Sequence, residues 1–304
     1  MPLFWWRGFF AVKTPEKQFE QSAAPVTPKD FIERNTIRGL WAICRDWLII
    51  AGAITVSILA DHWAVWLASV WIIGVMQFAL AEAILHEASH YNLFQSRRLH
   101  HRLQFLYAWP FLQTMSDYQG EHLDHHRYLM SDRDQTSVDY RMYGLAKRNP
   151  NLFFIWFIKP FTLYPTWHYL RHGNAALDRK NWLPLGLFWG GITGLSLWLG
   201  QAHIVLLYWF VPLLWVYPML NYWSEIEEHY NTRDESRSNL AKALNFLTHN
   251  EGYHTVHHRY PTIPFYNLPD AHAAFVGDEA DISHGFLDTF RQICAKKDLS
   301  VNGT

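Results

Sequence analysis

The 304-residue chain has few cysteines and no excess of positive charge. Cys44 and Cys294 are its two cysteines, and their spacing favours neither a disulfide framework nor a cysteine-ligated iron–sulfur cluster. Basic and acidic residues number 26 and 27, so the charge balance does not indicate a nucleic-acid partner. Neither a GxGxxG fingerprint nor a flavin motif is apparent, and a bound nicotinamide or flavin is therefore not predicted.

Lysine and arginine are absent from two long stretches, residues 46–96 and 181–232. Each stretch is long enough to cross a bilayer twice, because one helical crossing takes about 20 apolar residues. The apolar segments are Trp47–Ala60, Trp63–Leu85, Trp182–Leu199 and Ile204–Tyr222. They predict two transmembrane hairpins, with Arg45-Asp46 interrupting the start of the first. Buried helices of a large soluble core are the alternative, which the aromatic residues near the segment ends disfavour.

The predicted fold is an all-α integral membrane protein with four transmembrane helices in two hairpins and a helical cap on one face. We expect a single domain over residues 1–304. Its parts are an N-terminal arm (1–39), hairpin one (40–85), a middle segment (86–180), hairpin two (181–222) and a C-terminal segment (223–304). Every Lys and Arg lies on the side that holds the arm, the middle segment and the C-terminus. The positive-inside bias predicts that this side, with both termini, is cytosolic.

Nine of the eighteen histidines form clusters just past the cytosolic ends of the hairpins. Box 1 is His86 and His90, box 2 is His122, His125 and His126, and box 3 is His254, His257 and His258; His229 stands alone after the fourth apolar segment. The other nine are taken as ordinary surface, interfacial or core residues: His62, His100, His101, His168, His172, His203, His249, His272 and His284.

The spacing of the clusters indicates metal ligation. Residues three and four apart share a helix face, so His122 could act with His125 or with His126, and the same choice exists in box 3. Adjacent histidines project about 100° apart on a helix and could therefore serve two metals. One HxxxH pattern arises easily by accident on an amphipathic helix, but three clusters on one side of a membrane indicate a binuclear site.

In this order, the HxxxH, HxxHH and HxxHH patterns resemble the three histidine boxes of the membrane fatty acid desaturase/hydroxylase superfamily. Residues 250–261 (NEGYHTVHHRYP) are similar to the third box of that family and its flanks, and the resemblance extends over about residues 40 to 275. It implies two iron ions, with O₂ as co-substrate. The iron ligands that it implies are His86, His90, His122, His125, His126, His229, His254, His257 and His258.

Carboxylates near the boxes are expected to orient the ligand imidazoles by accepting their second N–H. Asp124 and Glu251 are the first choices because they lie closest to the boxes. Glu225 stands where some acyl-CoA desaturases have an asparagine, and its carboxylate could bind iron directly. Further candidates are Glu87, Glu121, Asp132, Asp134 and Glu228.

The resemblance implies O₂-dependent desaturation of a fatty acyl group, carried as an acyl lipid or an acyl thioester, by hydrogen abstraction. A hydroxylase or ketolase of the same superfamily, acting on a carotenoid, alkane or other small amphiphile, is the alternative. A zinc hydrolase or a metal transporter is a third class. Electrons are expected from a separate ferredoxin or cytochrome with its reductase. The basic groups at Arg97-Arg98, Arg102, Lys147-Arg148 and Arg179-Lys180 either dock that donor or anchor the protein at the membrane.

Overall fold

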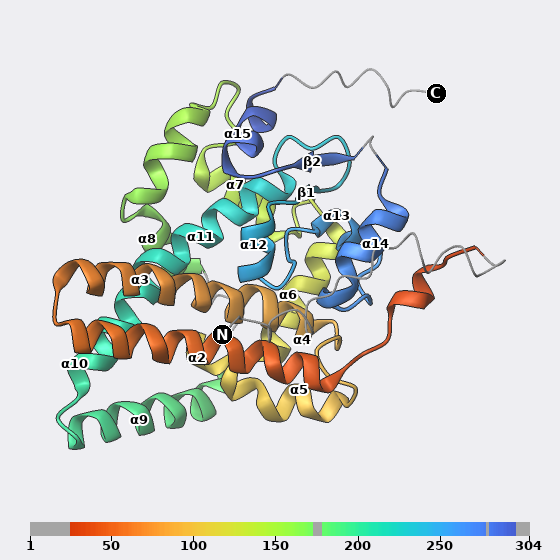
Figure 1. Cartoon of the computed structure of the whole chain (residues 1–304). Helices are drawn as coiled ribbons and strands as arrows, with labels where there is room; N and C mark the ends of the chain where they lie inside the picture. The colour runs from red at the N-terminus through yellow and green to blue at the C-terminus, as the bar shows by residue number, and fades with distance from the viewer. Residues whose placement is uncertain (1–24, 173–177, 278–279, 296–304) are drawn as a thin grey trace, which may run out of the picture.

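A computed structural model describes residues 25–172, 178–277 and 280–295 (Figure 1). These residues are mostly helical, in agreement with the predicted class. The sheet that they contain pairs β1 (Arg237–Asn239) with β2 (Asp281–Ser283) in parallel. Most of the predicted N-terminal arm, residues 1–24, and the C-terminal residues 296–304 lie outside the described part.

The first predicted hairpin is formed by α2 (Thr36–Ala60) and α3 (Trp63–Phe78). Asp61 closes the turn in the left-handed conformation, with φ of 43°, and the ring of His62 caps the start of α3. A π-helical segment (Ala79–Ile84) and α4 (Leu85–Ser89) continue α3 without a break. The continuous helix therefore reaches box 1 itself, rather than ending before it.

The start of the first helix was predicted wrongly, because α2 begins at Thr36 and not at Trp47. Arg45 and Asp46 do not interrupt it, since their charges are paired inside the fold. The Arg45 Nε donates to Asp46 Oδ1 over 2.8 Å, and the His249 ring lies 2.7 Å from Asp46 Oδ2. A buried carboxylate is tolerated in a helix when it is paired in this way.

The second predicted hairpin consists of α9 (Trp182–Trp198) and a long helix, Ala202–His229, which comprises α10 (Ala202–Val205), a π-helical segment (Leu206–Phe210) and α11 (Val211–His229). Within the part of the chain that the structure describes, three helices are long and apolar enough to cross a membrane: Thr36–Ala60, Trp63–Ser89 and Ala202–His229. With 17 residues, α9 is shorter than a usual span of about 20, so the fourth span stays a prediction.

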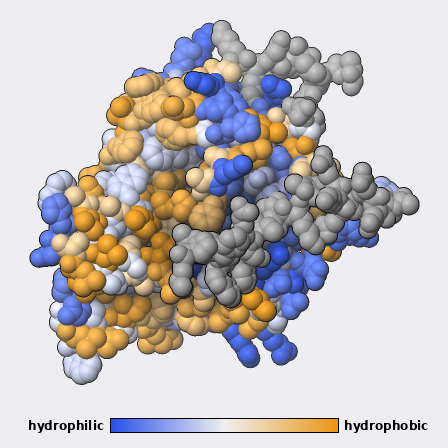
Figure 2. All heavy atoms as spheres, in the orientation of Figure 1, coloured by the Kyte–Doolittle hydropathy of each residue, from blue (hydrophilic) through white to orange (hydrophobic). Residues whose placement is uncertain are grey.

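The long helices pack closely through small residues, and their outer sides are apolar. A Cβ added to Gly74 of α3 would stand 2.4 Å from the Val216 Cβ of α11, so glycine permits this approach. On α9, the Trp198 and Leu187 side chains are 81% and 69% exposed. Figure 2 shows hydrophobic residues gathered over α2, α3 and α9. Such a surface suits contact with lipid.

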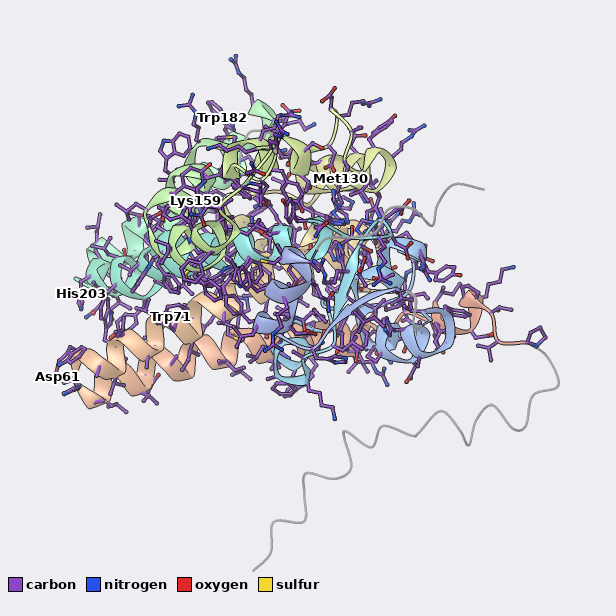
Figure 3. All side chains as sticks on the ribbon, turned by 90° about the horizontal axis from the view of Figure 1, so that it is seen from above. Asp61, Trp71, Met130, Lys159, Trp182 and His203 are labelled. Atoms are coloured by element: carbon purple, nitrogen blue, oxygen red, sulfur yellow. The ribbon has the colours of Figure 1, made fainter. Side chains whose placement is uncertain are left out.

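The cap lies at the end of the long helices away from the Asp61 and His203 turns (Figures 1 and 3). Its helices are α5 (Arg97–Leu103), α6 (Met115–Tyr128), α7 (Gln135–Tyr143), α8 (Tyr164–His172), α12 (Lys242–Leu247), α13 (His254–Arg259), α14 (Leu268–Phe275) and α15 (Phe286–Cys294). Short 3-10 turns (Gln104–Leu106, Trp109–Phe111, Lys159–Phe161, Phe265–Asn267) and a π-helical turn (Phe154–Ile158) lie between them, while the 3-10 turns Pro28–Phe31 and Arg179–Asn181 precede α2 and α9.

A proline in α11 anchors part of the cap. Pro218 cannot donate the helical hydrogen bond to the Leu214 carbonyl. The Thr166 hydroxyl of α8 donates to that carbonyl instead, over 2.5 Å. This hydrogen bond attaches α8 to α11 beside the cavity described below.

Candidate metal centre

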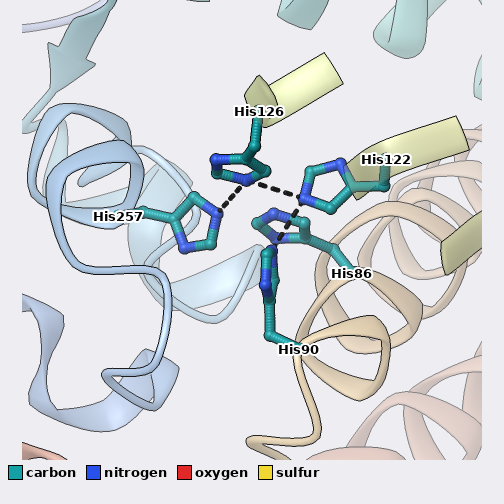
Figure 4. A group of neighbouring side chains, drawn as sticks. All are labelled: His86, His90, His122, His126 and His257. Carbon is teal, nitrogen blue, oxygen red and sulfur yellow. Dashed lines mark hydrogen bonds between the residues drawn. The ribbon is translucent and has the colours of Figure 1, made fainter. Parts of the chain in front are cut away.

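Five histidine rings from three parts of the chain converge on one point in the cap (Figure 4). They come from the end of the α3–α4 helix, from α6 and from α13: His86, His90, His122, His126 and His257. One ring nitrogen of each lies within 4.8 Å of all the others. The Nε2 atoms of His90 and His122 are 2.8 Å apart, and those of His122 and His126 are 2.9 Å apart. We call this group site A.

Four further histidines form a second group, site B: His125, His229, His254 and His258. Their ring nitrogens also lie within 4.8 Å of one another. The His229 Nε2 is 3.2 Å from that of His125 and 3.0 Å from that of His254. All nine predicted histidines thus fall into one of two neighbouring groups.

Helical periodicity explains how the boxes divide. Residues His122 and His126 of α6 share a face and join site A, whereas His125 projects toward site B. In α13, His254 and His258 join site B while His257 joins site A. In each helix, the two histidines that are four residues apart share a site. The histidine three residues after the first of them joins the other site. As predicted, each adjacent pair divides between the two sites.

The histidine nitrogens fit metal ions better than they fit one another. The Nε2 atoms of His86 and His258 are buried without a hydrogen-bond partner, which is costly without a ligand. Burial and then the neighbouring rings lower the pKa of His122, His257 and His258 well below 6.5, and burial lowers that of His126 to about 3. Neutral imidazoles with free lone pairs are what a cation requires.

Two ligand candidates have the second ring nitrogen occupied by the protein. The Nδ1 of His125 lies 3.0 Å from Asp134 Oδ1, and His229 Nδ1 lies 2.8 Å from the Glu235 carbonyl oxygen. With Nδ1–H donating to these acceptors, each Nε2 lone pair faces site B. Acceptors of this kind fix the tautomer and orientation of metal-binding histidines.

The carboxylates expected to orient the histidines differ in whether they contact one: Asp134 does and Asp124 does not. Asp124 lies on the outer side of α6, half exposed and 3.9 Å from Arg133, and no described contact joins it to a box histidine. It was therefore the wrong first choice: Asp134, from the looser set of candidates, makes the contact with His125. Asp124 directly precedes His125, and one step along a helix turns its side chain about 100° away.

Glu225 and Glu251 both line a cavity beside the histidines. Glu225 accepts a 2.5 Å hydrogen bond from the Tyr143 hydroxyl and is not among the atoms converging in site A or site B. Glu251 has one buried carboxylate oxygen without a hydrogen-bond partner. Burial, with the charges of nearby glutamates, raises the pKa of Glu251 well above its ordinary value.

Several buried polar contacts were not predicted from the sequence. His249 pairs with Asp46, and His168 Nε2 lies 3.0 Å from Asp139 Oδ1, so both are buried core histidines whose carboxylate partners were not predicted. Glu82, in the π-helical segment before box 1, accepts a hydrogen bond from the Tyr217 hydroxyl. A lone charged residue within an apolar run was the available signal for Glu82.

The cavity has a volume of about 190 Å³ and reaches both groups of histidines. Its lining comes from α3–α4, α6, α7, α8, α11 and the loop before α13. Gly252 keeps that loop against β1, because an added Cβ would stand 2.4 Å from the Asn239 carbonyl oxygen. The arrangement is therefore two histidine groups that could each hold a metal ion, beside a cavity that both groups line.

The paired histidine groups are consistent with a metal site, and the long apolar helices are consistent with an integral membrane protein. The family model for fatty acid desaturases matches residues 61–286, and the chain therefore belongs to the fatty acid desaturase family. As a member, it is an oxidoreductase with a di-iron-like histidine site.

Curated relatives differ in what their names say they act on. Dihydrorhizobitoxine desaturase from Bradyrhizobium elkanii is 29% identical, covering 78% of this chain and 75% of the relative. A human sphingolipid delta(4)-desaturase/C4-monooxygenase is 28% identical over 64% of this chain and 61% of its own length. An endoplasmic reticulum omega-3 fatty acid desaturase from Vigna radiata is 24% identical, covering 80% and 73%.

Proposed function

We propose that this chain is an O₂-dependent di-iron desaturase that introduces a C=C bond into an alkyl segment of its substrate. The observation that carries the proposal is the convergence of nine imidazoles in two groups beside one cavity. In the balanced reaction, O₂ takes two hydrogens from adjacent carbons together with two electrons and two protons, and leaves as two water molecules.

Site A would hold one iron and site B the other. A structural zinc site closes at four ligands and a catalytic one keeps three, so nine imidazoles exceed what one zinc ion takes. Imidazole suits iron as well as zinc or copper, and the family favours iron. When bound, the iron pair would supply the reductive O₂ chemistry that removes hydrogen from an unactivated carbon.

The protein's own part is to hold the ligands and to exclude water. Asp134 fixes the ring of His125, and the Glu235 carbonyl fixes that of His229. Burial of the box 3 histidines keeps their nitrogens neutral and available. The cavity beside them positions the alkyl segment, which decides the carbons that lose hydrogen.

A fatty acyl group is the substrate that the family name suggests, and the similarity to an omega-3 fatty acid desaturase supports it. Hydroxylation at the same centre is the second candidate. The name of the human relative pairs a desaturase with a monooxygenase, and this pairing favours that candidate. The two reactions share the first hydrogen abstraction and differ in whether the carbon then loses a second hydrogen or gains oxygen.

We propose that the three long helices and α9 cross the membrane as two hairpins, with the histidine cap in the cytosol. The exposed apolar side chains of α9 support a fourth span, and the distribution of Lys and Arg supports the orientation. A separate ferredoxin or cytochrome, with its reductase, would supply electrons at the exposed basic face near Arg97 and Arg98.

The test is to express the wild type and His257→Ala in one host with a matched reductase and to compare lipids and polar metabolites by mass spectrometry. A product two hydrogens lighter than its precursor, present only with the wild type, is expected. A product one oxygen heavier would support the hydroxylase instead. Identical profiles for the two proteins in hosts that supply acyl, sphingoid and amine metabolites would count against both.

A further inference from the structure

The proposed reaction consumes protons inside the fold. Reduction of one O₂ to two water molecules takes two hydrogens from the substrate, two electrons from the donor and two protons from solvent. The histidines of sites A and B cannot carry these protons while their lone pairs bind metal ions. Another group must therefore bring protons into the cavity that both sites line.

One histidine that lines this cavity belongs to neither metal site. Among the described residues, six histidines line the cavity, and five of them are in site A or site B: His86, His122, His125, His229 and His254. The sixth is His168 of α8. Histidine is the residue type that most readily takes up and releases a proton near neutral pH, and it is the commonest general acid and base in enzymes.

A carboxylate holds the His168 ring. The His168 Nε2 lies 3.0 Å from Asp139 Oδ1 of α7, and the two residues are buried, with exposed fractions of 9% and 3%. Asp139 also lines the cavity, and the same oxygen accepts a 2.9 Å hydrogen bond from the Gln135 side chain. Because the carboxylate accepts, the His168 Nε2 carries a hydrogen, and proton exchange takes place at Nδ1. The negative partner also offsets the charge that the ring gains with a second proton.

Water can connect this pair both with solvent and with the histidine sites. Glu121 lines the same cavity and is exposed, so the cavity reaches the surface of the protein. The cavity volume of about 190 Å³ has room for about six water molecules at about 30 Å³ each. A proton can thus pass from His168 to an oxygen atom that is being reduced in the cavity without direct contact between the two.

We propose that the His168–Asp139 pair delivers the protons that O₂ reduction consumes in this cavity. In each transfer the Nδ1–H bond of the protonated His168 ring breaks, and cavity water passes the proton to reduced oxygen, where an O–H bond forms. Solvent water then returns a proton to Nδ1, and two such transfers for each O₂ balance the reaction. The inference rests on the proposed desaturase function and adds the residues that supply its protons.

The test compares the wild type with His168→Gln. Glutamine can donate to Asp139 Oδ1 as the ring does, but its amide cannot take up a proton, so the contact is kept and the relay is lost. Iron-loaded full-length protein in a neutral detergent is reduced with dithionite and mixed with O₂ in a stopped-flow instrument, in H₂O and in D₂O. Without substrate, the two electrons of the reduced iron pair and two protons convert O₂ to H₂O₂, so the reaction still consumes protons.

His168→Gln is expected to slow O₂ consumption on the order of 100-fold, the lower end of what a positioned proton donor contributes. Its solvent isotope effect should exceed that of the wild type, and added imidazole should restore part of the rate. A purely structural role would produce neither sign. The matched control is His100→Gln: the His100 ring is buried and accepts a 3.1 Å hydrogen bond from the Phe94 N–H, but it does not line the cavity.

A second measurement does not depend on metal chemistry. Hydrogen exchange at the C2 position of each histidine ring is followed in the wild type in D₂O by mass spectrometry. His168 should exchange faster than His100, because solvent water reaches the cavity that His168 lines.

Wild-type O₂ consumption by iron-loaded His168→Gln would overturn the inference. A slowing without a larger isotope effect and without rescue by imidazole would also overturn it, as would equal exchange of His168 and His100. If His168→Gln does not retain iron, Asp139→Asn takes its place, with the same slowing and isotope effect expected. A wild type that binds no iron, or that binds iron and does not consume O₂, would instead contradict the proposed function.

Discussion

Replacing Asp134 by asparagine removes the contact that orients a site B histidine while preserving the shape of the side chain. Asp134 lies 3.0 Å from the His125 Nδ1 and accepts hydrogen bonds from the backbone N–H groups of Met130 and Thr136, over 2.8 and 3.1 Å. An amide has one accepting oxygen, so asparagine cannot serve all three donors. If its NH₂ faces His125, that ring must carry its proton on Nε2 and cannot bind metal.

The expected cost falls on the metal and not on the fold. Removing an orienting carboxylate typically lowers metal affinity about 10–100-fold, or about 1.4–2.7 kcal/mol. Asparagine is as good an N-cap as aspartate, so the start of α7 should be retained. Asp124→Asn is the control, since Asp124 is half exposed and contacts Arg133 alone among the interactions described.

Iron retained against a graded chelator, measured by elemental analysis, gives the readout. Asp134→Asn should release the site B iron first, and the control should follow the wild type. Equal retention by Asp134→Asn and the wild type would refute the orienting role. A loss shared by both variants would also refute it, because only one of the two residues touches a histidine.

Three further predictions follow from packing and protonation. Gly74→Ala should lower the melting temperature, because the new Cβ would overlap Val216 at a cost of about 1–3 kcal/mol. The control, Gly120→Ala, adds a Cβ in open space and should not lower it. Equal melting temperatures for the two variants would contradict the tight contact between α3 and α11. Gly252→Ala should lose iron while keeping its helical circular dichroism, and full iron content would show that the loop before box 3 tolerates the shift. The melting temperature and the amount of bound iron should both fall as the pH drops below about 6.5. The reason is that the pKa of His126 is lowered to about 3 in the folded protein, so that this ring binds a proton in the unfolded chain but not in the fold. A melting temperature that stays constant from pH 7.5 to 5 would contradict this.

The histidine groups could be predicted from the sequence because they depend on local periodicity. Ligands four residues apart in α6 and α13 share a face wherever those helices lie. The sequence alone does not show whether a histidine shares its site with the partner three or four residues away. That depends on how α6 and α13 pack against each other. The same is true of Asp134: nine residues after His125, it returns to that ring through the turn that caps α7.

Long-range pairing explains the error at the start of the first helix. Arg45-Asp46 looked like an interruption because the local sequence does not show the contact with His249, whose ring lies 2.7 Å from Asp46 Oδ2 and comes from the loop before box 3. The cavity was also beyond prediction. Its lining residues are spread from Glu82 to His254 in the sequence, and only the packing of the helices brings them to one cavity.

The most direct measurement for the whole account is the metal content of the purified protein after expression with ⁵⁷Fe, with Mössbauer spectra of the same sample. We predict two irons per chain, both in nitrogen-rich surroundings, with His126→Ala depleting site A and His125→Ala depleting site B. Zinc in place of iron, or a single metal ion per chain lost equally in both variants, would contradict the di-iron centre on which the proposed reaction depends.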